Sequence, residues 1–150
     1  RRLGLDAARR EAVGLGALLH DVGKIAVPDG ILLKSGPLTS AEQAVMREHP
    51  AAGYRILCRV GIPAEAAECV LTHHERYDGR GYPQGLSGDA IPVGARIFAV
   101  VDAYDALTSV RPYRGAVSHA EAVSTIRAGA GTQFDPRVVT AMMDLGEAAI

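Results

Sequence analysis

The chain has 150 residues, and its 16 Lys and Arg against 17 Asp and Glu leave a formal charge of −1. This length is typical of one domain with a sizeable core, and a charge so close to zero argues against a long polyanion such as DNA as the partner. The most apolar run, residues 97–107, is short and contains two aspartates, so it is not a membrane span. We therefore expect a single domain, residues 1–150, that contacts neither DNA nor a membrane.

Helices are predicted along the whole chain by capping signals and by apolar residues at roughly 3.6-residue spacing. Asp6 is the expected cap of the first helix, in which Val13, Ala17, Leu18 and Val22 follow that spacing. Capping boxes, Thr39 with Glu42 and Ser118 with Glu121, begin two others, and prolines begin three more. The expected helices span residues 7–23, 39–46, 50–61, 63–75, 92–109, 118 onward and 136–145. No run of period two is long enough for a sheet, so we expect an all-α fold.

Two loops, residues 27–39 and 77–94, stand out by their proline and glycine content. The two cysteines, Cys58 and Cys69, lie in apolar or alanine-rich surroundings without CxxC spacing. Such cysteines are usually reduced core residues of cytoplasmic proteins. We expect both thiols to be buried and the protein to be cytoplasmic.

The helix over residues 92–109 contains five consecutive apolar residues, 97–101, so we expect it to be buried on all sides. Asp102 and Asp105 follow directly, and a buried carboxylate needs a cation or hydrogen-bond donors. A metal ion is the simplest such partner. Asp105 has the alternative of anchoring a neighbouring helix through hydrogen bonds.

Six polar residues are expected on inward faces of four segments: His20, Asp21, His49, His73, His74 and Asp102. Lys24 is four residues after His20 and is expected on the same face of the first helix. Mixed nitrogen and oxygen ligands suit divalent ions such as Fe, Mn or Zn, and the two oxygens of Asp21 can bridge a pair. A bridged pair would acidify a shared water for in-line attack on phosphorus.

Each of these residues also has a simpler interpretation. His49 alone can be a helix cap or a half-buried core residue, and His20 with Asp21 can be a surface ion pair. His119 lies in the first turn after Ser118, away from the other histidines, and is expected to be exposed. The recurrence of His and Asp on apolar helices favours a metal site.

The chain contains the motifs HDVGK (20–24), HP (49–50), HHERYDGRGYP (73–83), ARIFAVVDAYDALTSVRPYR (95–114) and GTQFDP (131–136). In these motifs it resembles the HD-GYP domain, a helical branch of the HD phosphohydrolase superfamily, and the resemblance covers essentially the whole chain. It implies an HD-domain helical bundle and a cyclic di-GMP phosphodiesterase of the bacterial cytoplasm, with pGpG and in some members GMP as product.

The resemblance also implies roles for individual residues. The implied ligands of two divalent ions are His20, Asp21, His49, His73, His74 and Asp102, with Asp21 bridging. Iron or manganese is favoured, with zinc, nickel, magnesium or cobalt as alternatives. The expected catalytic residues are Asp21, Lys24 and Asp105, and the expected substrate-binding residues are Lys24, Gly81, Tyr82, Pro83, Arg111 and Arg114. Tyr82 could instead pack the turn against the core. Arg111 and Arg114 could instead form ion pairs with acids on the surface.

Two departures from the family pattern concern the metals and a supporting contact. The family has a further histidine ligand upstream, but no histidine precedes His20. We expect the domain to lack the first family helix. The metal site formed by His49, His73, His74 and Asp21 is then expected to bind its ion at a lower metal concentration than the site formed by His20, Asp21 and Asp102. Val110 stands where an aspartate is frequent, which removes a supporting hydrogen bond.

The partners and the alternatives follow from the same resemblance. We expect the domain to be fused to a sensor or receiver domain. Its expected binding partner is a second copy of the chain or a diguanylate cyclase domain. One alternative is a catalytically impaired module that binds nucleotides or proteins. Another is an HD hydrolase acting on a different nucleotide.

Overall fold

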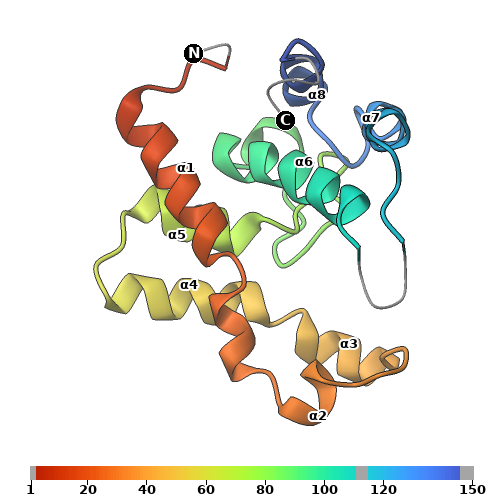
Figure 1. The fold of residues 1–150 in the computed structure, drawn as a ribbon. Helices are drawn as coiled ribbons and strands as arrows, with labels where there is room; N and C mark the ends of the chain where they lie inside the picture. Colours follow the sequence, from red (N-terminus) through yellow and green to blue (C-terminus); the bar gives the residue numbers. More distant parts are fainter. Residues whose placement is uncertain (1–2, 111–114, 146–150) are drawn as a thin grey trace.

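The computed structural model describes residues 3–110 and 115–145, in which helices are joined by loops (Figure 1). The helices are α1 (Ala7–Leu19), η1 (Val22–Ala26), α2 (Asp29–Leu32), α3 (Ser40–Met46), α4 (His49–Arg59), α5 (Ala64–Thr72), η2 (Gly88–Ala90), α6 (Val93–Thr108), α7 (His119–Ala128) and α8 (Pro136–Met143). The described residues form no strand beyond two isolated bridges. The all-α prediction is confirmed.

The expected helix caps are present. Asp6 accepts a hydrogen bond from the Arg9 N–H, and Thr39 with Glu42 forms a complete capping box. Ser118 with Glu121 forms the second box at the start of α7. Each cap satisfies backbone donors that a helix leaves free, which stabilises the helix by about 1 kcal/mol.

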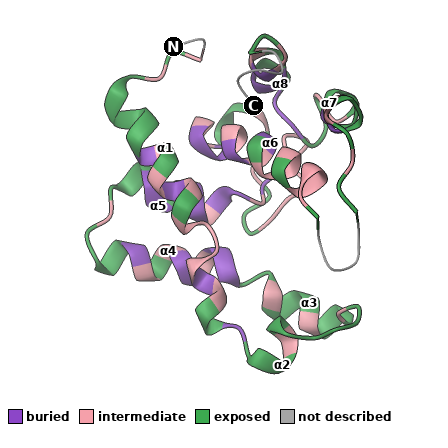
Figure 2. Cartoon of the chain, in the orientation of Figure 1, coloured by how far each residue is buried: buried purple, intermediate pink, exposed green. Residues whose placement is uncertain are grey.

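Helix α5 packs against α1, α4 and α6, and Figures 1 and 2 show it in the middle of these helices. Its small residues allow the close approach: Ala66, Ala67, Cys69 and Val70 are at most 1% exposed. Gly16 of α1 completes this contact, because a Cβ there would lie 2.8 Å from the Cβ of Cys69. Burial raises the pKa of the Cys69 thiol to about 12. The predicted burial of Cys69 is confirmed, whereas Cys58 is exposed on α4 and that prediction was wrong.

A second part of the core joins α6 to α7 and α8. Val100, Ile126, Phe134, Val138, Val139 and Met142 form one buried cluster there. The expectation that α6 is buried on all sides was wrong, since Val101 is 56% exposed and Asp105 is exposed. The helix contacts α1, α5, α7 and α8, and the side that carries Val101 and Asp105 faces solvent.

The first helix ends earlier than predicted, and this moves the HD pair off it. Helix α1 ends at Leu19, His20 is its C-cap, and Asp21 precedes the 3₁₀ helix η1. Gly23 of η1 packs so closely on α4 that a Cβ there would collide with the His49 carbonyl oxygen. His20 and Lys24 therefore belong to different helices, and Leu18, expected inside, is 79% exposed.

Four charged side chains, here called the arginine network, join the loop before α6 to α6 and α8. Arg96 Nη1 donates to Asp89 Oδ1 and to Asp135 Oδ2, both at 2.7 Å. Arg137 donates to Asp89 and to both oxygens of Asp135. Burial raises the pKa of Asp135, but Arg137 and Arg96 outweigh it and hold that pKa below its usual value. The buried carboxylate is thus compensated within the protein.

None of the described helices combines the length and the apolar character needed to cross a membrane.

Candidate metal centre

Histidines stand where helices begin or end, so unpaired helix carbonyls orient their rings. His20 is the C-cap of α1, His49 is the first residue of α4 after α3, and His73 is the C-cap of α5. Each Nδ1 pairs with the carbonyl oxygen three residues earlier: Ala17 at 2.7 Å, Met46 at 2.8 Å and Val70 at 2.7 Å. A carbonyl only accepts, so Nδ1 carries the proton and Nε2 keeps its lone pair for a ligand.

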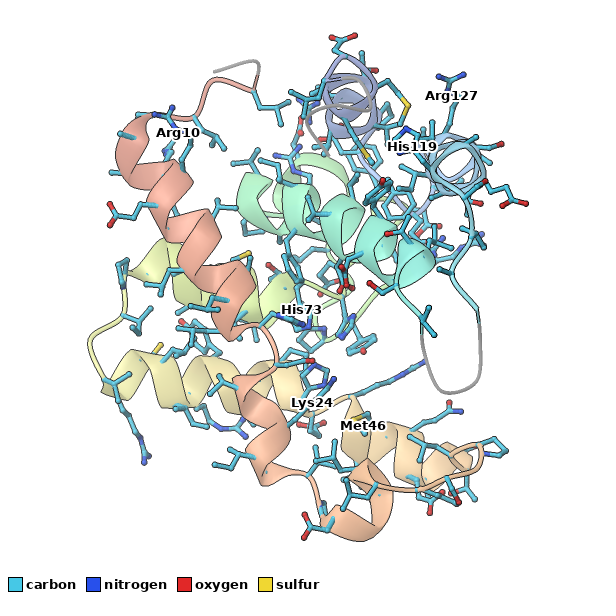
Figure 3. All side chains as sticks on the ribbon, viewed as in Figure 1. Arg10, Lys24, Met46, His73, His119 and Arg127 are labelled. Atoms are coloured by element: carbon cyan, nitrogen blue, oxygen red, sulfur yellow. The ribbon has the colours of Figure 1, made fainter. Side chains whose placement is uncertain are left out.

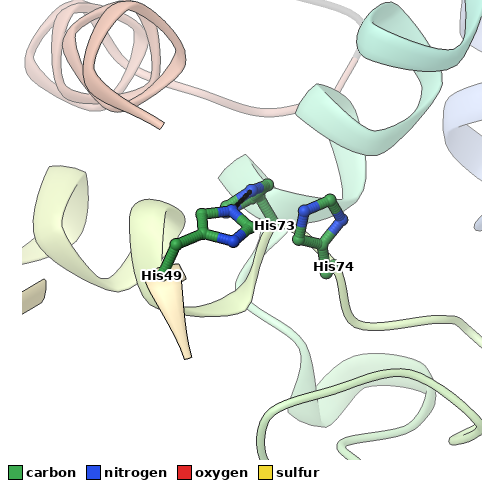
Figure 4. A group of neighbouring side chains, drawn as sticks. All are labelled: His49, His73 and His74. Carbon is green, nitrogen blue, oxygen red and sulfur yellow. Dashed lines mark hydrogen bonds between the residues drawn. The ribbon is translucent and has the colours of Figure 1, made fainter. Parts of the chain in front are cut away.

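Three of the imidazoles converge on one point. His49, His73 and His74 each offer one nitrogen, and these nitrogens all lie within 4.8 Å of one another (Figure 4). The Nε2 atoms of His49 and His73 are 3.3 Å apart. Both of these side chains are buried, at 2% and 4% exposure. The arrangement presents several nitrogen lone pairs to a single small volume.

Burial keeps these imidazoles neutral. It lowers the pKa of His49, lowers that of His73 to about 4, and lowers that of His74 to about 3. Protonated neighbours would add further repulsion. At neutral pH the three rings are therefore unprotonated, which is the form that binds metals.

Asp21 lies between two of the histidines. Its Oδ2 is 3.3 Å from His20 Nε2 and accepts a hydrogen bond of 2.6 Å from Lys24 Nζ, while its Oδ1 is 3.5 Å from His49 Nε2. Burial raises the pKa of Asp21, but Lys24, His20 and His49 outweigh it and bring that pKa below its usual value. Figure 3 shows the labelled side chains of Lys24 and His73 in the same part of the view. One ionised carboxylate thus faces two imidazoles through different oxygens.

Asp102 reaches the same region from α6. It lines a cavity of about 370 Å³ together with His73 and His74. Asp105 does not belong to this lining and is exposed, and its carboxylate accepts a hydrogen bond from Ser109 Oγ at 3.3 Å. The expectation that Asp105 is buried was wrong, because α6 turns that residue toward solvent.

The donor set fits a divalent metal ion. We use the term imidazole cluster for His20, His49, His73 and His74 with Asp21. It combines three neutral imidazoles, those of His49, His73 and His74, with the His20 ring and with a carboxylate that offers two oxygens. Such a mixture of nitrogen and oxygen ligands suits iron, manganese or zinc. Asp102 supplies a further carboxylate to the adjoining cavity.

Glu75 is a residue that the sequence interpretation missed. Its side chain is 4% exposed and accepts three backbone hydrogen bonds, from Gln84 at 2.7 Å, Gly85 at 3.1 Å and Leu86 at 3.0 Å. The carboxylate therefore anchors the loop that follows the histidine pair. No spacing rule connects an acid with amides nine to eleven residues later, so only the folded loop reveals this contact.

The GYP segment packs directly on the cluster. The ring of Tyr82 stacks on the His74 ring with centroids 4.7 Å apart. The backbone N–H of Tyr82 donates a hydrogen bond to the His74 carbonyl oxygen at 3.3 Å. Gly81 has no room for a side chain, since a Cβ would lie 2.6 Å from the same oxygen. Pro83 follows through a cis peptide bond. The Arg47 guanidinium, which the sequence interpretation also missed, has its Cζ 5.2 Å from the Tyr82 ring centroid.

Three further sequence expectations have different outcomes. Arg111 and Arg114 lie outside the described residues. His119 was expected to be exposed, but it is half-buried and shares a 2.8 Å hydrogen bond with the Tyr104 hydroxyl. That expectation was wrong because α7 packs its first turn against α6.

Comparisons with known proteins identify the family of the chain. The sequence model of the HD domain family matches residues 1–138. The chain is 47% identical over 144 residues to the "Cyclic di-GMP phosphodiesterase response regulator RpfG" of Xanthomonas campestris, covering 95% of this chain and 38% of that protein. It is 38% identical over 143 residues to "3'3'-cGAMP-specific phosphodiesterase 2" of Vibrio cholerae, covering 94% of this chain and 27% of that protein.

A solved structure has the same fold. The crystal structure of a cyclic GMP-AMP specific phosphodiesterase of V. cholerae superposes with a TM-score of 0.73 at 19% identity. The match covers 95% of this chain and 39% of the other. This chain therefore spans well under half the length of the proteins that it matches.

Proposed function

Because the chain belongs to the HD domain family, we propose that it is a metal-dependent phosphodiesterase that hydrolyses cyclic di-GMP, with pGpG or GMP as the final product. The observation that carries this proposal is the convergence of three neutral imidazoles within 4.8 Å, beside an ionised carboxylate. A protein gains nothing in stability from crowding unprotonated rings and an acid in this way unless a cation completes the set.

The residues proposed to hold two divalent ions are His20, Asp21, His49, His73, His74 and Asp102, and iron or manganese is proposed for both. When bound, such ions polarise a phosphoryl group and lower the pKa of a coordinated water. Asp21, with one oxygen toward His20 and the other toward His49, is the proposed bridging ligand.

The chain's own side chains have separate proposed tasks around that centre. Lys24, 2.6 Å from Asp21, holds an ammonium at the edge of the cluster, where it can contact a phosphate or give a proton to the leaving oxygen. Gly81, Tyr82 and Pro83 form a wall of the substrate site that Glu75 fixes in place. Arg111 and Arg114 remain proposed phosphate contacts, and Asp105 remains a proposed catalytic residue.

The names of the relatives divide between two substrates, cyclic di-GMP and 3'3'-cGAMP. Relatives at 43–48% identity are named for cyclic di-GMP and relatives at 37–39% for 3'3'-cGAMP, which favours cyclic di-GMP as the substrate here. One relative is also named a response regulator. We propose by analogy that this domain is the output part of a longer signalling protein.

The test combines metal analysis with an assay on both cyclic dinucleotides. Protein purified without oxygen is analysed for iron, manganese and zinc, and then incubated with each dinucleotide. We expect bound divalent metal and conversion of cyclic di-GMP to pGpG that a chelator abolishes. Bound metal without turnover of either dinucleotide would identify an impaired, binding-only module. Absence of metal at any concentration would refute the assignment of the ligands.

A further inference from the structure

The end of α3 is held in a fixed relation to the imidazole cluster. Arg47 is the C-cap of α3 and precedes His49 by two residues. Its N–H donates to the carbonyls of Gln43 and Val45, and the carbonyl just before it, that of Met46, accepts from His49 Nδ1 at 2.8 Å. The backbone of Arg47 is therefore tied both to α3 and to a proposed metal ligand.

The side chain of Arg47 extends to the GYP segment. Its Cζ lies 5.2 Å from the ring centroid of Tyr82, and that ring stacks on His74 at 4.7 Å. A guanidinium held through the π-electrons of a ring keeps its N–H donors for other partners. Arg47, Tyr82 and His74 thus form one series of contacts from the protein surface to the proposed metal centre.

The charge of Arg47 is not neutralised by an acid of the described chain. The residue is exposed, and none of the ion pairs found among the described residues includes it. Other cations close to the site differ: Lys24 is paired with Asp21 at 2.6 Å, and Arg76 with Asp78 at 2.8 Å. Arg47 therefore offers an anion a charge that does not first have to leave a carboxylate.

We propose that Arg47 is a further substrate-binding residue, which contacts a phosphate of the cyclic dinucleotide. The inference rests on the proposed function and adds α3 to the elements that hold the substrate. A planar guanidinium matches two phosphate oxygens at once, and such charge-assisted hydrogen bonds are the strong ones. The contact with Tyr82 holds the side chain in place before binding, which reduces the entropy lost when the substrate is captured.

The test is a binding measurement on the manganese-loaded chain. The probes are phosphorothioate analogues of cyclic di-GMP and of 3'3'-cGAMP that resist hydrolysis. Arg47→Ala is expected to raise the Kd roughly 10-fold or more, with unchanged metal content. Arg47→Lys keeps the positive charge but lacks the planar guanidinium, so its Kd should lie between those of the unmodified chain and of Arg47→Ala. Arg55→Ala removes an exposed arginine of α4 away from the site and is the matched control, expected to bind like the unmodified chain.

The outcomes separate this inference from the proposed function. Equal weakening for both analogues supports a phosphate contact, because they share the phosphates and differ in one base. Unequal weakening would assign Arg47 to a base and overturn the phosphate contact. An Arg47→Ala chain that binds as Arg55→Ala does, or that loses metal, also overturns it. If the unmodified chain binds the analogues, and Arg47→Ala weakens that binding, but neither natural dinucleotide is hydrolysed, the Arg47 contact is supported and the proposed phosphodiesterase activity is refuted. If the unmodified chain binds neither analogue, both proposals are refuted.

Discussion

Two polar regions of the molecule, the imidazole cluster and the arginine network, are built on opposite principles. In the arginine network the buried Asp135 carboxylate has guanidinium partners on both oxygens, so the protein itself compensates each charge. In the imidazole cluster the Nδ1 atoms of His49 and His73 are held by backbone carbonyls, while one nitrogen of each of His49, His73 and His74 lies within 4.8 Å of the others. The difference indicates that the first region holds the fold together, whereas the second is completed by a ligand.

The largest expected effect comes from the carboxylate of the imidazole cluster. Asp21→Ala should lower hydrolysis of cyclic di-GMP about 10³-fold or more, because a lost metal ligand costs more than the 10- to 100-fold of an outer partner. Metal content by elemental analysis should fall with it. Asp29→Ala, which removes an exposed acid at the start of α2, is the control and should keep both. Full metal occupancy in Asp21→Ala would mean that the cluster is not the metal site.

Substitutions in the arginine network should lower stability and leave metal binding unchanged. Arg96→Ala removes a partner of the buried Asp135, which should lower the free energy of unfolding by about 3 kcal/mol. Arg137 remains as a partial substitute. Urea denaturation measures the loss, and the metal bound per folded chain should not change. Arg137→Ala should lower the free energy of unfolding less than Arg96→Ala does, since the Arg137 side chain is 57% exposed. A loss of metal in Arg96→Ala would show that the two regions are not separate.

Glu75 is a buried carboxylate that holds the loop after the GYP segment through three backbone hydrogen bonds. Glu75→Gln keeps the shape but replaces one accepting oxygen by an NH₂ group that cannot accept, so one of the three loop amides loses its partner. We expect a loss of about 2 kcal/mol in the free energy of unfolding and a higher KM, with metal content retained. Glu11→Gln on the exposed face of α1 serves as the control. An unchanged KM would limit Glu75 to a role in folding.

The smallest effect concerns the pH dependence of the metal-free chain. The pKa values of His73, about 4, and His74, about 3, lie below their ordinary 6.5, so the unfolded chain binds more protons in that interval. Their contribution to stability is complete above pH 6.5 and is lost as the pH falls, down to about 4 for His73 and about 3 for His74. Asp89 and Asp135 have lowered pKa values instead, so the arginine network loses stability only below about pH 3.8.

Urea denaturation in a chelator, at intervals from pH 7 to pH 3, tests this separation. The unfolding free energy should fall in the upper window and again in the lower one. His74→Gln should flatten mainly the upper window, because most of the interval from pH 6.5 to about 3 in which His74 acts lies above pH 3.8. A constant stability from pH 7 to pH 4.5 would show that the imidazoles are not held neutral by burial.

Local signals in the sequence were sufficient for most of the fold. Asp6, Thr39 with Glu42 and Ser118 with Glu121 cap helices as predicted, because a cap depends on a few neighbouring residues. The burial of individual side chains was predicted less well. Leu18, Cys58 and Val101 are exposed because the packing partners of each helix, which the sequence does not give, decide which side is covered.

For the site, the sequence by itself determined the ligand types, and the tertiary structure decided their geometry. The histidines and acids were recognisable from residue type, position near helix ends and family resemblance. Only the fold brings His49 within hydrogen-bonding distance of His73 and places Asp21 between His20 and His49. Glu75 and Arg47 were not predicted, since one acts on amides across a loop and the other on a ring supplied by a distant segment. Helix caps are interactions between near neighbours in the chain, whereas these contacts exist only after the helices have packed.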